Sequence, residues 1–207
     1  MRKLLRTPLF VAPTANIGPF CSRLIRDQSG NGLLEFALGL PIMLAIYFGS
    51  LNISDAIILQ RKVVAATRAL ADLTTQGSAF TVVTLNNSVF QGAQMDLAPY
   101  SISNANMYVT EIYTDTTGKS TVQWSEQNIG GTVGANTQSG YSNGSVITLW
   151  NNVAVKGTYQ VVANIQYNYS PLIANQFIGS FPISTTIAMG PRASACVAVN
   201  GAPVCPQ

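Results

Sequence analysis

The chain has 207 residues, of which only 9% are charged and 47% are hydrophobic, and its formal net charge is +3. This composition is too apolar for an intrinsically disordered protein. The positive charge is confined to residues 1–30, which carry five basic residues and one acidic residue, whereas residues 31–207 carry six and seven. A nucleic-acid-binding patch on the folded part of the chain is therefore not expected.

Residues 1–30 form a basic leader with three prolines and no sustained periodicity, so no regular structure is expected there. Between Gly32 and Leu51 the only formal charge is Glu35. As a helix this stretch is about 30 Å long, which matches the hydrocarbon thickness of a bilayer. The preceding cationic segment predicts a single-pass membrane protein with a cytoplasmic N-terminus. In a Gram-negative bacterium this would be an inner-membrane protein with a periplasmic C-terminal domain. A cleaved export signal is the alternative, although its basic region and apolar core would both be unusually long.

The apolar segment continues as an amphipathic pattern, with Ile53, Ile57, Val64 and Leu70 at helical spacing. The sequence therefore predicts one helix over residues 31–76 that ends at Gly77. Pro41 has no N–H group and clashes with the preceding turn, so a kink is expected there rather than an end.

Residues 77–207 are predicted to form a periplasmic α+β domain. Thr84–Pro99 is expected to be a short packed helix, capped by Thr84 or Asn86. Strand-forming residues then dominate an antiparallel sheet. The predicted strands are residues 107–115, 120–126, 145–150, 158–169 and 182–189. Residues 130–145 hold five glycines and are expected to form a long mobile loop.

The residues that usually carry enzymatic chemistry are missing from the sequence. The chain has no histidine, which is the commonest general base and metal ligand. It also shows no serine nucleophile motif, phosphate-binding loop or metal-spaced cysteines. Glu111 and Asp115 are interpreted as solvated edge residues, and Tyr167 and Tyr169 as packing residues on one sheet face. We therefore expect no enzyme activity, no cofactor and no metal.

The three cysteines differ in their expected compartment, because Cys21 precedes the membrane segment and Cys196 and Cys205 follow it. Asn200-Gly201 is a preferred pair for a two-residue type I′ hairpin turn. Counting outward from this turn places Cys196 opposite Cys205 as a non-hydrogen-bonded pair, about 4.5 Å apart between Cα atoms. That separation predicts a disulfide within a hairpin over residues 196–205. Two free thiols are the alternative.

The segment GNGLLEFALGLPIMLAIYFGSLNISDAIILQRKVVAATRALADL resembles the TadE/TadG-like pilus assembly proteins of tight-adherence (Tad/Flp) systems, within the prepilin-like class. The specific core of the resemblance is EFALGLP, residues Glu35–Pro41. A second similarity lies in Tyr167–Arg192, which looks like the closing strands of longer TadE-like members.

The resemblance implies cleavage by a prepilin peptidase between Gly30 and Asn31, and a role as a minor pilin or pseudopilin. It assigns Glu35 and Phe36 to assembly and Pro41 to the helix. The implied partners are the peptidase, other pilin-like subunits, membrane proteins of the pilus machinery and the lipid bilayer, with no nucleic acid and no small-molecule substrate. Asn31 differs from the first mature residue of many pilins, so N-methylation is not implied.

Other interpretations of these residues remain open. Glu35 could be an acid near the helix N-terminus that reaches water at headgroup depth. The whole chain could be a bitopic membrane protein that displays a periplasmic binding domain. It could also be a secreted, adhesin-like β domain whose apolar stretch is an export signal.

Overall fold

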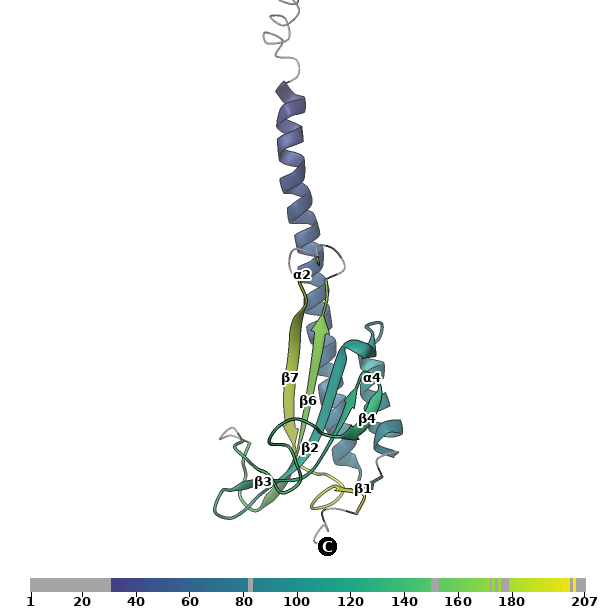
Figure 1. The fold of residues 1–207 in the computed structure, drawn as a ribbon, viewed down its shortest axis with the longest axis vertical. Coiled ribbons are helices and arrows are strands. Elements are labelled where there is room, and N and C mark those ends of the chain that lie inside the picture. The colour runs from purple at the N-terminus through teal and green to yellow at the C-terminus, as the bar shows by residue number, and fades with distance from the viewer. Residues whose placement is uncertain are drawn as a thin grey trace, which may run out of the picture. The chain divides into compact units, whose positions relative to one another are not determined.

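The computed structural model describes residues 31–81, 84–149, 153–171, 173, 175, 179–201 and 203. The chain divides into two compact units, Met1–Tyr47 and Phe48–Gln207, which we call the amino-terminal and carboxy-terminal units. The boundary lies within helix α2 (Asn31–Gln76), labelled in Figure 1. The sequence placed the domain boundary after residue 76 instead. The difference arises because the second half of α2, residues 48–76, belongs to the core of the carboxy-terminal unit.

Helix α2 runs without interruption through Pro41 and ends at Gln76, as predicted. Gly77 at this end has no left-handed backbone, but it is closely packed. A Cβ atom on Gly77 would lie 2.2 Å from Cζ of the Phe80 ring. Any other residue would therefore displace that ring.

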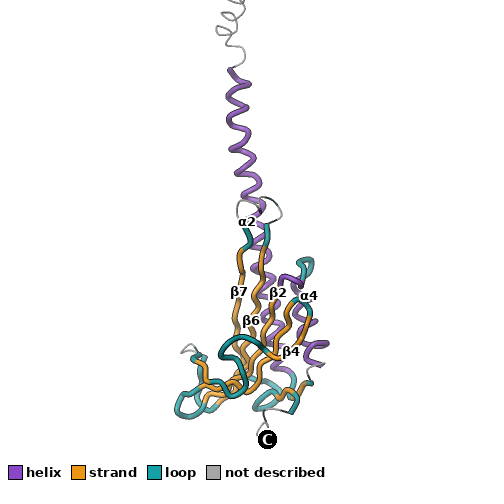
Figure 2. Tube along the Cα trace, viewed as in Figure 1, coloured by secondary structure: helices purple, strands orange, loops and turns teal. Residues whose placement is uncertain are grey.

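The carboxy-terminal unit contains a six-stranded antiparallel sheet, shown in orange in Figure 2. Its main order is β4-β3-β2-β6-β7, and β5 pairs with β3. The strands are β2 (Ala105–Thr114), β3 (Ser120–Ile129), β4 (Thr132–Ala135), β5 (Val146–Ile147), β6 (Thr158–Tyr169) and β7 (Phe181–Met189). The α+β class is confirmed. The glycine-rich residues 130–145 are not a loop throughout, because β4 lies within them and pairs with β3.

One face of the sheet packs against the second half of α2. Leu59, Val63 and Leu70 of α2 are fully buried in one core with Val109 of β2 and Ile165 of β6. These strand residues are odd-numbered, so even-numbered residues of the same strands face the opposite side of the sheet.

The predicted short helix is present as a π-helical turn, η1 (Leu85–Phe90), followed by α4 (Gln91–Leu97). Neither predicted capping residue is confirmed as a cap. Thr84 has helical backbone angles and makes no capping bond. Thr81 accepts the hydrogen bond instead, because its hydroxyl receives the N–H of Thr84 at 3.2 Å. A one-turn 3₁₀ helix, η2 (Ile102–Asn104), then leads into β2.

The C-terminal segment joins a separate two-stranded parallel sheet. Strand β8 (Ala198–Val199) pairs with β1 (Ala79–Phe80), directly after α2. Asn200 and Gly201 have φ angles of 51° and 83°, the positive values that a type I′ turn needs. The second strand of the predicted hairpin lies largely outside the described residues.

Candidate functional site in the amino-terminal helix

The first half of α2, residues 31–47, exposes large apolar side chains around its whole circumference. Leu33 is 75% exposed, Leu38 is 73% exposed and Ile46 is 68% exposed. The sequence produces this surface because no polar stripe interrupts the apolar residues over successive turns. The helix is long and apolar enough to span a membrane. A contiguous apolar surface of this kind marks a contact with lipid or with another protein.

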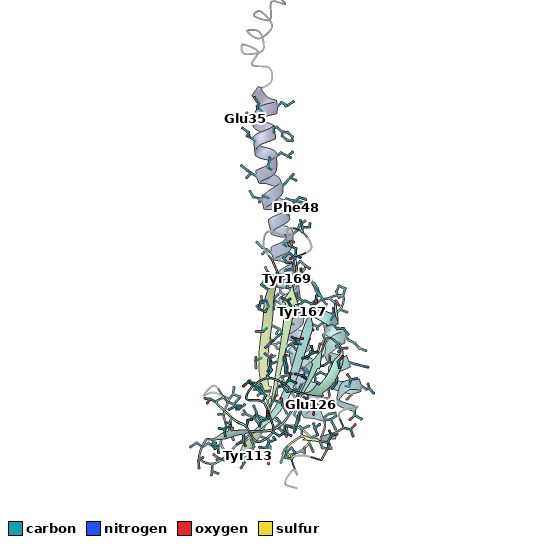
Figure 3. All side chains as sticks on the ribbon, viewed as in Figure 1. Glu35, Phe48, Tyr113, Glu126, Tyr167 and Tyr169 are labelled. Atoms are coloured by element: carbon teal, nitrogen blue, oxygen red, sulfur yellow. The ribbon has the colours of Figure 1, made fainter. Side chains whose placement is uncertain are left out.

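The resemblance-based assembly residues lie on this surface. Glu35 is exposed on α2, as Figure 3 shows, and Phe36 is 64% exposed beside it. Pro41 lies six residues further along the same helix. Gly30 and Cys205 lie outside the described residues, and of Asn31 only the backbone is described, at the start of α2. The structure therefore leaves both Glu35 and Phe36 accessible on the helix, while the peptidase site stays a prediction.

The spacing of Asn31 and Glu35 determines what this end of the helix can do chemically. Four residues correspond to about 6 Å along the axis and to roughly one turn, so both residues share a helix face. A terminal amine at Asn31 would carry a positive charge beside the helix's own positive end, which is unfavourable. A carboxylate one turn away, or on an adjacent helix, would offset that charge.

The second half of α2 holds a different acid, Asp55, which the sequence did not single out. The hydroxyl of Tyr100 donates to Asp55 Oδ1 at 2.5 Å, and that of Tyr169 donates to Oδ2 at 2.8 Å. One turn earlier, Asn52 Nδ2 donates to the carbonyl of Ile173 at 2.7 Å. These bonds join α2 to the end of β6 through Tyr169, to the segment between α4 and η2 through Tyr100, and to the residues after β6 through Ile173.

Burial and the contact with Asp55 together raise the pKa values of the two tyrosines. Burial and the hydrogen bond to Asp55 raise the pKa of Tyr169 to about 12. The same two causes, in the same order, raise the pKa of Tyr100 further. Both hydroxyls therefore stay protonated and act as donors at physiological pH. The cluster supports the fold rather than proton transfer.

Glu111 of β2 is fully buried, so its interpretation as a solvated edge residue is wrong. Its Oε2 accepts from Trp124 Nε1 at 2.9 Å and its Oε1 accepts from the N–H of Val197 at 2.6 Å. Burial raises the pKa of Glu111 to about 7, and the two hydrogen bonds oppose that rise. Through its bond to Val197, the Glu111 carboxyl connects the C-terminal segment to strand β2 of the sheet.

The remaining predicted residues support the domain rather than a chemical site. Tyr167 and Tyr169 are each 3% exposed on the core face of β6, as predicted. Cys196 is buried and disulfide-bonded, while its predicted partner Cys205 lies outside the described residues. Among the described residues, no cluster of histidine, cysteine, aspartate or glutamate could hold a metal ion.

Comparison with known proteins adds no family to these observations, because no protein-family model, curated protein or solved structure matches the chain. The case for a function therefore depends on the exposed half of α2 and on the sequence around Glu35.

Proposed function

We propose that this protein is a membrane-anchored, pilin-like subunit that takes part in the assembly of a Tad/Flp-type pilus. The observation that carries the proposal is the exposed apolar surface of α2 with a single carboxylate, Glu35, near its beginning. Burying an unpaired carboxylate in a bilayer costs several kcal/mol. Such a residue is better explained by a partner than by the membrane alone.

The proposed partner of Glu35 is the new terminal amine of a neighbouring copy. A prepilin peptidase cleaves after Gly30, and the amine of Asn31 then carries a positive charge. Within one chain that amine is already disfavoured by the helix dipole. Between adjacent helices the carboxylate and the amine neutralise each other where the dielectric constant is low. The contact is head-to-tail, and a head-to-tail contact whose rotation does not close produces a helical filament when it is repeated.

The proposed topology follows from charge. The leader with its five basic residues stays in the cytoplasm, the first half of α2 crosses the inner membrane and the carboxy-terminal unit lies in the periplasm. Alkaline phosphatase fused after Gln207 would be active in this orientation. An inactive fusion together with a fluorescent cytoplasmic reporter at the same position would contradict it.

The decisive experiment is terminal-peptide mass spectrometry of the mature protein, with and without the prepilin peptidase. A pilin-like protein begins at Asn31 only when the peptidase is present. Retention of residues 1–30 in the presence of the peptidase would support the bitopic alternative. Loss of residues 31–51 would support the secreted alternative.

The role of Glu35 is tested separately from cleavage. Glu35→Ala is expected to insert and to be cleaved, but to be absent from sheared pili. Leu34→Ala is the matched control, since Leu34 is the adjacent exposed residue and points in another direction around the helix. Normal piliation with Glu35→Ala would show that this acid has no part in assembly.

A further inference from the structure

A cleft with a volume of about 180 Å³ lies on the face of the sheet opposite α2. Its floor includes Tyr108, Asn164 and Thr186, even-numbered residues of β2, β6 and β7. The register places these three residues side by side across the strands, because Tyr108 pairs with Asn164 and Asn164 pairs with Thr186. Gln138 and Tyr141, from the connection between β4 and β5, line the opposite wall.

The wall formed by this connection is held in place by hydrogen bonds to β3. Asn136 Nδ2 donates to Ser125 Oγ at 2.9 Å, and Gln127 Oε1 accepts the N–H of Thr137 at 3.1 Å. Further along, the N–H of Gly144 donates to the carbonyl of Val122 at 2.7 Å. The cleft is therefore preformed, and a ligand would not have to order the connection.

The polar groups of the cleft are neutral, and several are free to bind. No residue that lines the cleft is charged. Asn164 Nδ2 donates to Thr186 Oγ1 at 2.7 Å, which orients the amide. Among the described residues, the side chains of Tyr108, Tyr141 and Gln166 have no hydrogen-bond partner, although all three line the cleft. The fully buried, unpartnered side-chain atoms of the described chain belong to Glu126, Asn128 and Gln160, none of which lines it. The unpartnered groups of the cleft are therefore not completely buried, and Tyr141 and Gln166 are partly exposed.

One end of the cleft is apolar. Ile112, Leu149 and Val162 form a small second core there. The cleft therefore combines an aliphatic surface and tyrosine rings with amide and hydroxyl groups that both donate and accept. This combination matches a sugar ring, which has an apolar C–H face and hydroxyl groups that both donate and accept.

We propose that this cleft binds a neutral sugar residue of a glycan. Its volume is below the roughly 300–1,000 Å³ of sites for drug-sized ligands, so one ring would enter and the rest of the glycan would stay outside. A peptide strand is a poorer fit, because strand addition needs a free edge, whereas the cleft lies on the face of the sheet and most of its floor belongs to β2 and β6, which are paired on both sides. The proposal departs from the sequence-based expectation of no small-molecule ligand, and it is independent of the pilus role.

The test is saturation-transfer difference NMR on the full chain, with glucose, galactose, mannose and N-acetylglucosamine as separate probes at millimolar concentration. The protein is held in lauryldimethylamine oxide, because sugar-based detergents would compete for the cleft. We expect signals from at least one of the four sugars and none from N-acetylneuraminic acid, whose carboxylate finds no cation among the lining residues. Absence of transfer to all four neutral sugars would overturn the proposal.

Two variants locate the binding. Tyr141→Phe removes one hydroxyl from the wall, and Gln166→Ala removes one amide from the floor, so each is expected to weaken binding roughly threefold to tenfold. Asn168→Ala is the matched control, because Asn168 lies on the same face of β6 but is exposed and does not line the cleft. Circular dichroism would verify that each variant is folded. Equal weakening by Asn168→Ala, or no weakening by either cleft variant, would place the sugar elsewhere and contradict the proposal.

Discussion

The two halves of α2 both carry large apolar side chains, but they differ in how far those side chains are buried. In the first half, Leu34 and Leu38 are 62% and 73% exposed, whereas Leu59 and Leu70 in the second half are fully buried. From Leu59 onward the second half alternates its buried residues with exposed basic residues such as Arg61 and Arg68, so one side meets the core and the other meets water. The first half has no such polar side.

This difference separates the functions of the two halves. A helix that is apolar on every side is stable only where something other than water surrounds it. The sheet provides that surrounding for the second half, whereas the described residues of the amino-terminal unit leave the first half exposed. The second half is thus a structural element, and the first half is available for contact with lipid or with another protein.

A pair of leucine variants tests the comparison most directly. Leu70→Ala is expected to lower the free energy of unfolding of the carboxy-terminal unit by about 2–5 kcal/mol, because it leaves a cavity in the core. Leu38→Ala is the matched control and is expected to change it by less than about 0.5 kcal/mol. Denaturation of the full chain, followed by near-ultraviolet circular dichroism, measures both. Similar losses from the two variants would contradict the division of α2.

The pH dependence of stability tests the sheet that covers the second half. The ordinary pKa of Glu111 is 4.5 and burial raises it to about 7, so between these pH values the folded state keeps a proton that the unfolded state has lost. Its contribution to stability is complete below pH 4.5 and is lost as the pH rises to 7, a change on the order of 3 kcal/mol.

A glutamine variant isolates this effect from other groups. Glu126 acts in the same direction, because burial raises its pKa, whereas the pKa of Asp115 is lowered by hydrogen bonds from Thr117 and Lys119. In Glu111→Gln the decrease in stability between pH 4.5 and 7 should be much smaller. An unchanged slope would show that Glu111 does not titrate in this range.

A smaller contrast is expected between Asp55 and Glu35, an acidic residue from each half of α2. Asp55→Ala removes the carboxylate that accepts from the hydroxyls of Tyr100 and Tyr169 and leaves them only backbone carbonyls at 3.4 Å, so it is expected to destabilise the carboxy-terminal unit by about 1–3 kcal/mol. Glu35→Ala should leave that stability unchanged while it abolishes assembly. Chemical denaturation and pilus preparations, carried out on both variants, give the two readouts. A loss of stability with Glu35→Ala would contradict the separation of roles.

Much of the fold could be predicted because local pattern and packing agree. The strands show alternation, and the length of α2 follows from its apolar and helical pattern. The predicted buried face of α2 was largely wrong, because Ile53 and Ile57 are 64% and 47% exposed, whereas Leu59 and Val63 join Leu70 in the core. The sequence also held the signal for β4, since Gly130 and Gly131 form a two-residue turn with positive φ angles between β3 and β4. The five glycines of residues 130–145 were given more weight, and a loop was therefore predicted where β4 forms.

Glu111 and Asp55 could not be placed in the same way. The alternation Met107, Val109, Glu111 already puts Glu111 on the buried face, but its charge favoured an exposed position. Only the fold supplies its donor from Val197, which is 86 residues away in sequence. Asp55 likewise looks like a solvated residue of an amphipathic helix until Tyr169, 114 residues later, reaches it.

The smallest effect on stability is expected from removing the ion pair between the C-terminal segment and the end of α2. Arg192 Nη1 lies 2.7 Å from Asp72 Oδ1, but the two side chains are 59% and 35% exposed. An exposed ion pair contributes at most about 1 kcal/mol and is screened by salt. The backbone N–H of Arg192 also donates to the carbonyl of Thr75 at 2.9 Å, and that bond does not need the side chain.

Arg192→Ala, Asp72→Ala and the double variant form a thermodynamic cycle. We expect a coupling free energy of less than about 1 kcal/mol at low salt, and a smaller value in 1 M sodium chloride. Asp72 also accepts a hydrogen bond from Gln76 Nε2 at 2.6 Å, so Asp72→Ala alone should cost more than Arg192→Ala alone. A coupling above about 2 kcal/mol that persists in salt would mean that this contact, and not the buried leucines alone, holds the second half of α2 in the carboxy-terminal unit.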